Sequence, residues 1–332
     1  NAHCHAPMAL MRGIADDLPL MTWLNEHIWP AEAALVSPAF VADGIELAAA
    51  EMLAGGITAV NDMYFFPEVA AQAYRKVGMR AAIGLIVLEF PTAYARDADE
   101  YLAKGLKLAD ELKGDTLVHA CFAPHAPYTV SDASFERIRV YADQLGLRIH
   151  CHIHETAFEV EDARRAHGVR PLARLKRLGL LGPDLTAVHM TQLTPTEIED
   201  VARHGVVVAH CPESNLKLAS GFCPVGQLLA AGVHLAIGTD GSAGAAYASD
   251  VAPATIEVDA PAVVERFTPT KQRTRLTIIG SYLDFATFDP ARLHPTLLDA
   301  VPLGARWRTL EELPAGSKVV TDDVGVRMAM YR

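Results

Sequence analysis

The feature that most constrains the fold is a regular alternation of two kinds of segment between residues 43 and 240. Short runs of β-branched and apolar residues, each ending in polar residues, alternate with longer segments of helical periodicity. Many of the longer segments begin at Asp, Ser or Thr and end at Gly, as helices do. The strand-like runs are residues 56–62, 80–87, 116–128, 147–155, 185–192, 205–215 and 232–241.

The number of strands favours a (β/α)8 barrel. Helical segments separate the seven runs, and residues 1–6 have the pattern of the tail of an eighth strand. An open, doubly wound sheet is the alternative, but no GxGxxG motif follows any of the runs. We therefore expect an α/β fold, a (β/α)8 TIM-barrel with a truncated first strand, over residues 1–243.

The alternation ends after Gly241. Residues 244–332 are rich in Ala, Pro and β-branched residues but have no clear period. They contain one strand-like run, residues 275–280, and a hairpin pattern around Asp322 and Asp323. We expect this region to be atypical, or a tail that is not native to the barrel.

The composition narrows the partners and the compartment. A net charge of -11 argues against a nucleic-acid backbone or an anionic membrane as a partner. No apolar run reaches the roughly 18 residues of a membrane helix. The five cysteines are scattered and form no CxxC, which predicts small buried thiols in a reducing cytoplasm and not disulfides or a thiolate zinc site.

Histidines and carboxylates gather at the ends of the predicted strands. Because alternate residues of a strand face the same side, His3 and His5 of "NAHCHAP" can bind one ion. His152 and Asp240 would complete a set of three nitrogens and one oxygen, with room for a water molecule. Such a set suits Zn²⁺ or a similar divalent ion, which would make hydroxide available at neutral pH.

Two further residues suit proton transfer near this ion. Glu155 lies at the same strand end as His152 and could move protons, while His189 could hold the attacking water by a hydrogen bond. Asp240 could bind the ion through one oxygen and accept the proton of the water with the other. Taken alone, a strand-end residue such as His189 or His210 is more often structural, but the shared position at one end of successive strands favours a site.

Other metal-site motifs are absent from the sequence. It contains no HExxH and no PCxxC after an HxE, which excludes the chemistries of those two zinc sites. No lysine ends the run at residues 116–128, so a carbamylated lysine bridging two ions is not expected. The sequence predicts one ion.

These residues stand in blocks that resemble the amidohydrolase superfamily. Within it, the likeness is to the 5'-methylthioadenosine/S-adenosylhomocysteine deaminase group, also labelled TRZ/ATZ-family hydrolases, over residues 1–243. The blocks are "NAHCHAPMALMRGIADDLPLMTWLNEHIWPAEA", "AVNDMYF", "APHAPYTVSD", "HIHETAFEVED", "AVHMTQL", "HCPESNLKLASGFCPV" and "GTDGSA".

The resemblance implies a role for each matching residue. The metal ligands of the family fall on His3, His5, His152 and Asp240, its proton-shuttling glutamate on Glu155 and its water-orienting histidine on His189. Substrate contacts are implied at Glu32, which would bind the ribose hydroxyls, at His125 and His152 near the purine, and at His210 and Asn215.

The implied activity is hydrolytic deamination of a 6-aminopurine nucleoside to an inosine-type product and ammonia, with one divalent ion, Zn²⁺ or another such as Fe²⁺, in a homo-oligomer. In "GMRAAIGLIVLEF" no arginine stands where relatives that bind homocysteine hold its carboxylate, which favours methylthioadenosine or adenosine over S-adenosylhomocysteine. The alternatives are a triazine chlorohydrolase, a guanine-type deaminase, or an inactive fragment that only binds purines or a partner.

The sequence departs from this family at both ends. Family members lead into the HxH through a strand-rich segment and a complete first strand, and they return to a small β-domain after the barrel. This chain starts inside the first strand, and residues 244–332 do not match. We expect a truncated or frame-shifted product, a fragment, or a fused tail.

Overall fold

The structure is a computed structural model that describes residues 1–15, 18, 20–241 and four short strands nearer the C-terminus. The chain divides into two compact units: residues 1–224 with 228–247, and residues 225–227 with 248–332. The predicted boundary at residue 243 and most of the predicted tail, residues 244–332, lie outside the described residues.

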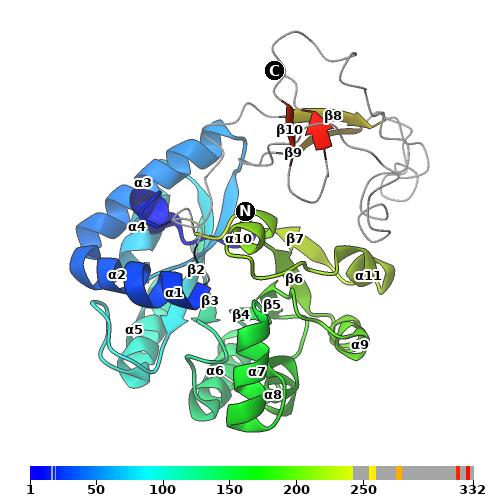
Figure 1. Cartoon of the computed structure of the whole chain (residues 1–332). Helices are drawn as coiled ribbons and strands as arrows, with labels where there is room; N and C mark the ends of the chain where they lie inside the picture. Colours follow the sequence, from blue (N-terminus) through cyan, green and yellow to red (C-terminus); the bar gives the residue numbers. More distant parts are fainter. Residues whose placement is uncertain are drawn as a thin grey trace. The chain divides into compact units, whose positions relative to one another are not determined.

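Seven strands form one sheet in the first unit, in the order in which they follow one another along the chain. Each strand pairs in parallel with the next, and helices lie outside the strands (Figure 1). Each strand overlaps a predicted run. The strands are β1 (Ala59–Met63), β2 (Arg80–Val87), β3 (Val118–Pro124), β4 (Ile149–Ile153), β5 (Leu185–His189), β6 (Val207–His210) and β7 (Leu235–Ile237).

The first residues of the chain join the two edges of this sheet. Cys4 forms parallel bridges with Asp62, which lies in β1, and with Asp240, which follows β7. The amide of Met63 donates to the carbonyl oxygen of Cys4 at 2.9 Å, and the amide of Ala2 donates to that of Ile237 at 2.9 Å. The N-terminal residues thus take the place of the eighth strand, as predicted, and the sheet closes into a barrel.

This closure depends on a close approach of two backbones. Gly238 lies beside His3, and a Cβ atom built on Gly238 would come within 2.8 Å of the Cβ and carbonyl oxygen of His3. Real Cβ atoms do not approach other atoms so closely, so only glycine admits the N-terminal strand here.

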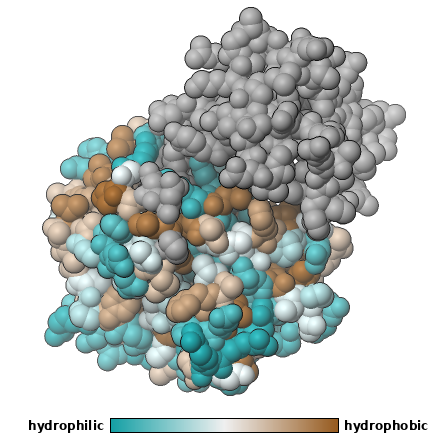
Figure 2. All heavy atoms as spheres, viewed as in Figure 1, coloured by the Kyte–Doolittle hydropathy of each residue, from teal (hydrophilic) through white to brown (hydrophobic). Residues whose placement is uncertain are grey.

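Helices follow the strands as the sequence predicts. In α9, Thr194 and Glu197 form a capping box at the start, and Gly205 ends the helix in a left-handed conformation. Hydrophilic side chains gather over α7 and α8 on the face drawn in Figure 2. The predicted helices are α3 (Pro38–Ala54), α4 (Pro67–Val77), α5 (Ala98–Glu111), α6 (Asp132–Leu145), α7 (Ala157–His167), α9 (Pro195–His204) and α11 (Val225–Ala230).

Several short helices have no counterpart in the predicted pattern. They are too short for a clear period, and those before α3 include a π-helical turn that buries Trp23, Leu24 and Ile28. This segment becomes one wall of the cavity described below. The additional helices are η1 (Ala6–Met11), α1 (Leu20–Thr22), η2 (Trp23–Ile28), α2 (Trp29–Leu35), α8 (Pro171–Arg177) and α10 (Pro212–Lys217).

The second unit contains two antiparallel strand pairs. β8 (Ala254–Val258) pairs with β9 (Thr274–Ile278), and β10 (Val319–Thr321) pairs with β11 (Arg327–Ala329). β9 overlaps the predicted run at residues 275–280. The pair β10–β11 flanks residues 322–326, as the predicted hairpin requires.

Two expectations from composition can be compared with the structure. All five cysteines are buried and free, as predicted. Among the described residues, no single helix has the length and apolar character needed to cross a membrane; Leu20–Leu35 and Pro38–Ala54 meet that test only as a pair bent by 111°.

Candidate metal centre and active site

The predicted site residues lie at the carboxyl ends of the strands. His152 is in β4 and Glu155 just follows it, His189 ends β5, and Asp240 follows β7. The backbone is strained here, because His189 and Asp240 have φ angles of 74° and 62°. These angles lie in the left-handed region, which residues other than glycine rarely adopt. Such strain is typical of positions where the fold fixes a side chain for function.

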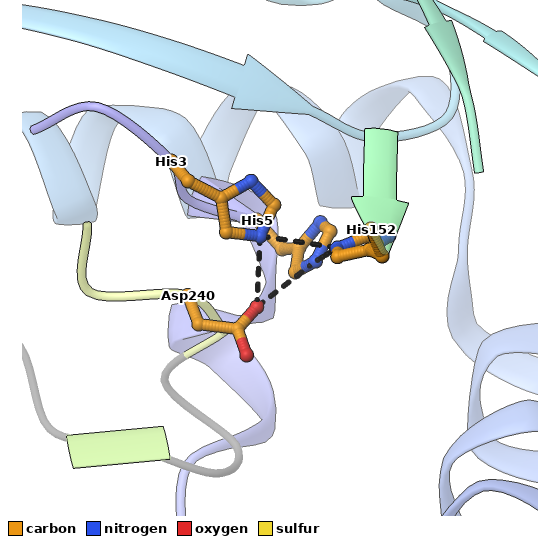
Figure 3. Close-up of side chains that lie close together, drawn as sticks. All are labelled: His3, His5, His152 and Asp240. Carbon is orange, nitrogen blue, oxygen red and sulfur yellow. Dashed lines mark hydrogen bonds and ion pairs between the residues drawn. The ribbon is translucent and has the colours of Figure 1, made fainter. Parts of the chain in front are cut away.

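Four of these side chains point toward one another (Figure 3). One ligand atom from each of His3, His5, His152 and Asp240 lies within 4.8 Å of all the others. Nε2 of His152 lies 3.1 Å from Nε2 of His3 and 3.2 Å from Nε2 of His5. Oδ1 of Asp240 lies 3.0 Å from Nε2 of His3 and 3.1 Å from Nε2 of His5. We call these four residues the ligand cluster.

The outer contacts of the ligand cluster decide where its protons are. Nδ1 of His5 lies 2.5 Å from the carbonyl oxygen of Met63, and Nδ1 of His152 lies 2.7 Å from that of His125. Because a carbonyl oxygen only accepts, both imidazoles carry a proton on Nδ1 and, when neutral, a lone pair on Nε2. When both rings are neutral, their two lone pairs face each other at 3.2 Å, an arrangement that a cation between them, either a proton or a metal ion, would stabilise.

The electrostatics of the ligand cluster favour neutral His3 and His152 beside an ionised Asp240, and a charged His5. Burial lowers the pKa of His152 far below its usual value and that of His3 to about 4. Burial opposes the charge of Asp240, but hydrogen bonds from His3 and His5 outweigh it and hold its pKa well below its usual range. Burial also lowers the pKa of His5, but Asp240 outweighs it and raises that pKa to about 9. One proton can offset part of this charge pattern, whereas a divalent cation would match all four groups.

The carboxylate of Asp240 is oriented from both sides. Its Oδ1 faces the imidazoles, while the hydroxyl of Ser214 donates to its Oδ2 at 2.5 Å. A carboxylate held in this way presents one fixed oxygen to an ion, as ligands with outer hydrogen-bond partners do.

Glu155 lies beside the ligand cluster and is buried, with only 5% of its surface exposed. Its Oε2 lies 3.6 Å from Nε2 of His189, and the hydroxyl of Ser220 donates to its Oε1 at 3.4 Å. Burial raises the pKa of Glu155, and the neighbouring His189 opposes that shift. A carboxyl group with a raised pKa keeps or takes up a proton more readily than an ordinary one, which suits a group that must accept and donate in turn.

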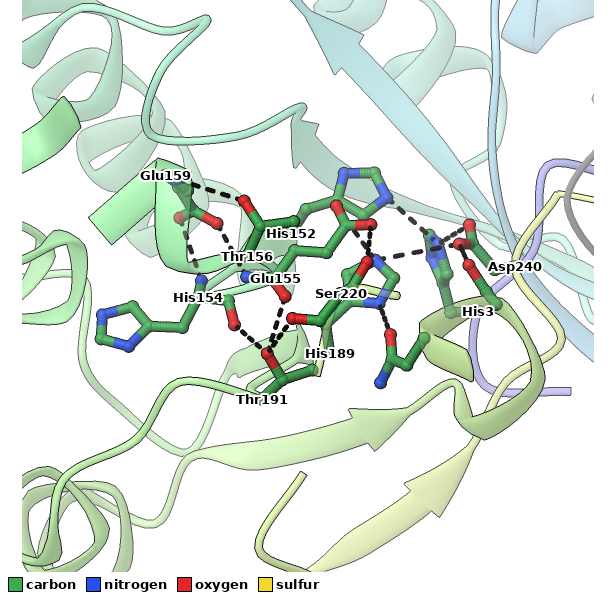
Figure 4. Close-up of polar contacts among 12 residues, drawn as sticks. His3, His152, His154, Glu155, Thr156, Glu159, His189, Thr191, Ser220 and Asp240 are labelled. Atoms are coloured by element: carbon green, nitrogen blue, oxygen red, sulfur yellow. Dashed lines mark hydrogen bonds and ion pairs between the residues drawn. The ribbon is translucent and has the colours of Figure 1, made fainter. Parts of the chain in front are cut away.

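A network of protein hydrogen bonds holds the backbone of Glu155 (Figure 4). The carboxylate of Glu159 accepts from the backbone amides of His154 at 3.0 Å and Glu155 at 2.7 Å. The hydroxyl of Thr191 donates to the carbonyl oxygen of Glu155 at 2.7 Å. Burial raises the pKa of Glu159 to about 7. We call Glu159, Thr191 and Ser220, which hold Glu155, the support network.

His189 faces the cavity with one nitrogen and the protein with the other. Its Nδ1 donates to Oδ1 of Asn215 at 2.7 Å, which leaves Nε2 as an acceptor in the neutral ring. That Nε2 lies 3.6 Å from Glu155 and 3.9 Å from Asp240. A water molecule near both carboxylates would therefore meet a ring nitrogen of fixed orientation.

A cavity of about 530 Å³ opens from the ligand cluster. Apolar and aromatic residues of η2, α2 and the ends of β1 and β2 form most of its wall, and none of the described residues that line it is lysine or arginine. Glu32 of α2 also lines the cavity, and the hydroxyl of Tyr64 donates to its Oε1 at 2.7 Å. Burial raises the pKa of Glu32 to about 7, although Tyr64 opposes the shift. The size suits a ligand as large as a nucleoside.

The structure places most of the predicted residues at this cavity. His3 lies just behind the wall and is fully buried, while Asn215 lies behind His189 and His210 is not part of the lining. Nδ1 of His210 is buried without a hydrogen-bond partner. The predicted residues that line the cavity are His5, Glu32, His125, His152, Glu155, His189 and Asp240.

Several supporting residues were not singled out from the sequence. Ser214 and Tyr64 hold Asp240 and Glu32, but a single hydroxyl in a motif gives no signal of its own. Glu159 had a signal, because it stands three residues after Thr156 at the start of a helix, in the spacing of a capping box. His150 also had one, because it alternates with His152 in β4 and so faces the barrel interior.

A closed barrel that brings three imidazoles and a carboxylate together at the carboxyl ends of its strands has the donor set of a site for one divalent metal ion. Comparison with protein families agrees: the model of the amidohydrolase family matches residues 1–296, and the chain belongs to this family.

Particular relatives are close. A 5-methylthioadenosine/S-adenosylhomocysteine deaminase of Teredinibacter turnerae is 53% identical over 243 residues, which are 73% of this chain and 55% of that protein. A 5'-deoxyadenosine deaminase of Methanopyrus kandleri is 43% identical over 244 residues, 73% of this chain and 56% of that protein.

The solved structure of an adenosine deaminase from Xanthomonas campestris, with bound zinc, is also similar. It is 59% identical, with a TM-score of 0.73 over 74% of this chain and 56% of that one. The chain thus spans about half the length of the relatives that it matches.

Proposed function

We propose that the protein is a metal-dependent aminohydrolase that deaminates a 6-aminopurine nucleoside. The observation that carries the proposal is the ligand cluster, in which three imidazole nitrogens and one carboxylate oxygen converge beside a buried carboxyl group and a nucleoside-sized cavity. The deaminase names of the relatives support the same reaction.

His3, His5 and His152 would hold the ion through Nε2 and Asp240 through Oδ1. Three neutral nitrogens and one carboxylate oxygen suit Zn²⁺ best, with Fe²⁺ or another divalent ion as the alternative. Such an ion would make a water molecule acidic enough to ionise at neutral pH.

The residues of the chain then divide the proton transfers. A water molecule, held by Nε2 of His189, adds to C6 of the purine. Glu155 takes one proton from this water and passes it to the ring nitrogen N1. The second proton of the water leaves with the amine, so that the C6–N bond breaks and ammonia departs. The product carries a carbonyl oxygen at C6 and a proton at N1. The raised pKa of Glu155 suits a group that must accept and donate in turn.

The cavity wall favours a neutral substrate. Glu32 would accept hydrogen bonds from the ribose hydroxyls, and the apolar wall would surround the 5' substituent. Since the part of the wall that the structure describes offers no lysine or arginine, a charged amino-acid tail would lose its hydration there without a partner. We therefore propose methylthioadenosine or adenosine as substrate over S-adenosylhomocysteine.

The proposal is tested by metal analysis and turnover of the purified chain. We expect one divalent ion per chain, loss of the adenine absorbance with methylthioadenosine and adenosine, release of ammonia, and a kcat/KM for S-adenosylhomocysteine at least about tenfold lower. A bound ion without turnover of any adenine nucleoside would instead favour a triazine or guanine-type substrate. Absence of any ion would identify a non-catalytic fragment and overturn the proposal.

A further inference from the structure

Each imidazole of the ligand cluster has an outer hydrogen bond, but the three partners differ in kind. Nδ1 of His5 and Nδ1 of His152 face backbone carbonyl oxygens. Nδ1 of His3 lies 2.9 Å from Nε2 of His150, a side chain that is itself buried in β4. The two rings are nearly perpendicular, with an interplanar angle of 79°.

We infer that His150 is the positioning residue that keeps the proton of His3 on Nδ1, so that the Nε2 lone pair of His3 points into the ligand cluster. The inference rests on the proposed function, because it assumes that an ion is bound there.

The chemistry of the two rings dictates where their protons lie. For His3 to bind a cation through Nε2, its proton must sit on Nδ1, where the acceptor within reach is Nε2 of His150. His150 must then carry its own proton on Nδ1, a buried atom without a hydrogen-bond partner. A buried donor without a partner is costly, so this tautomer of His150 needs the stabilisation that His3 and the ion provide.

His3 differs from the other two imidazole ligands in that its outer partner can either accept or donate a hydrogen bond. A carbonyl oxygen can only accept, so the tautomers of His5 and His152 are the same with and without an ion. A ring nitrogen can accept or donate, so the pair of His3 and His150 can reverse its hydrogen bond. Without an ion, Nε2 of His150 can donate to His3, and Nε2 of His3 can donate to Asp240, which lies 3.0 Å away. His3 is therefore the ligand whose tautomer, and with it the Nε2 lone pair that binds the ion, depends on a side chain that can be substituted.

Two substitutions test this role by metal affinity. His150→Phe keeps the ring shape but removes the acceptor, and we expect its Zn²⁺ dissociation constant, measured by competition with a chromophoric chelator, to rise about tenfold to a hundredfold. His150→Gln offers an amide oxygen near the position of Nε2, and we expect it to restore most of the affinity. Equal Zn²⁺ affinity of a folded His150→Phe chain and the wild type would overturn the inference.

A measurement on the wild-type chain covers the case in which His150→Phe does not fold. With ¹⁵N-labelled histidine and Zn²⁺ bound, we expect His3 to appear as the Nδ1–H tautomer with a coupling across the hydrogen bond to Nε2 of His150. An Nε2–H tautomer of His3, or no such coupling, would overturn the inference. A wild-type chain that binds no Zn²⁺ would instead overturn the proposed function, so the two failures are distinguishable.

Discussion

The ligand cluster and the support network are both buried and polar, yet they satisfy their hydrogen bonds in different ways. In the support network, the carboxylate of Glu159 accepts two backbone amides and the hydroxyl of Thr191 donates to a carbonyl oxygen. In the ligand cluster, Nε2 of His152 faces the Nε2 atoms of two other imidazoles. The support network makes its hydrogen bonds within the protein, whereas the ligand atoms of the ligand cluster converge on one another, as the donors of a metal site do.

This difference teaches which part of a buried polar site carries the ligand. Groups that pair with one another serve to fix geometry, and removing one of them should disturb position. Groups left facing one another with lone pairs serve to bind, and removing one of them should abolish binding. The predictions below test this division, beginning with the largest expected effect.

The largest effect is expected for Asp240→Asn. The substitution removes the negative charge from the ligand cluster and leaves the shape of the side chain. We expect the ion content to fall from about one per chain to near zero and kcat to fall by at least about 10⁴-fold. Metal analysis and steady-state kinetics measure both.

Asp110→Asn is the matched control, because Asp110 is exposed and pairs with Lys113 at the surface. It should keep both the ion and the activity. If Asp240→Asn also kept the ion and the activity, the ligand cluster would not be the metal centre, and the binding role given to it would be wrong.

Removal of the ion from the wild type should lower its stability. A ligand present at about a thousand times its dissociation constant stabilises the folded chain by about 4 kcal/mol. We expect a chelator to lower the thermal midpoint of the wild type and to leave that of Asp240→Asn unchanged. A chelator that lowers both equally would show that the ion acts elsewhere.

Glu155→Gln should separate binding from catalysis. The amide keeps the shape of the side chain but cannot carry the proton, so we expect kcat to fall by about 10³-fold. The ion content should stay near one per chain, because Glu155 is not part of the ligand cluster. Glu161→Gln, an exposed neighbour on α7, should change neither quantity. Loss of the ion in Glu155→Gln would mean that ion binding by the ligand cluster also depends on Glu155.

The support network should reveal itself in the pH dependence of stability. Burial raises the pKa of Glu159 from 4.5 to about 7 in the folded chain. The folded state therefore binds this proton more tightly than the unfolded state, and its contribution to stability is full below about pH 4.5 and lost as pH rises through 7. At about 1.4 kcal/mol per pKa unit, the loss reaches about 3 kcal/mol.

Glu159→Gln does not titrate, so the difference in free energy of unfolding between wild type and variant isolates this group. Urea unfolding from pH 5 to 7.5 should show the wild type losing stability relative to Glu159→Gln as pH rises. A difference that does not change with pH would show that Glu159 has the same pKa in the folded and unfolded chain.

The sequence predicts more of the ligand cluster than of its surroundings, for a physical reason. The period of two in a strand fixes the face of His3 and His5, and the barrel brings all strand ends together, so the ligands follow from pattern alone. Asn215 lies in the short helix α10, where a rotation set by tertiary packing decides whether a side chain meets the cavity or, as here, His189. The wall built by residues 20–35 was not predicted, because its helices are too short to show a period.

Glu32 shares one feature with the support network and one with the ligand cluster, and its substitution is expected to have the smallest effect on activity. One of its oxygens accepts from Tyr64, as in the support network, while the residue lines the cavity, as the ligand cluster does. Glu32→Gln should therefore raise KM about tenfold with little change in kcat, because it weakens hydrogen bonds to the ribose that persist throughout the reaction. A substrate that lacks both ribose hydroxyls should show a KM that is equal in wild type and Glu32→Gln, whereas the exposed Glu26→Gln control should follow the wild type with every substrate. An unchanged KM for the natural nucleoside would place the ribose elsewhere and leave Glu32 as a partner of Tyr64 alone.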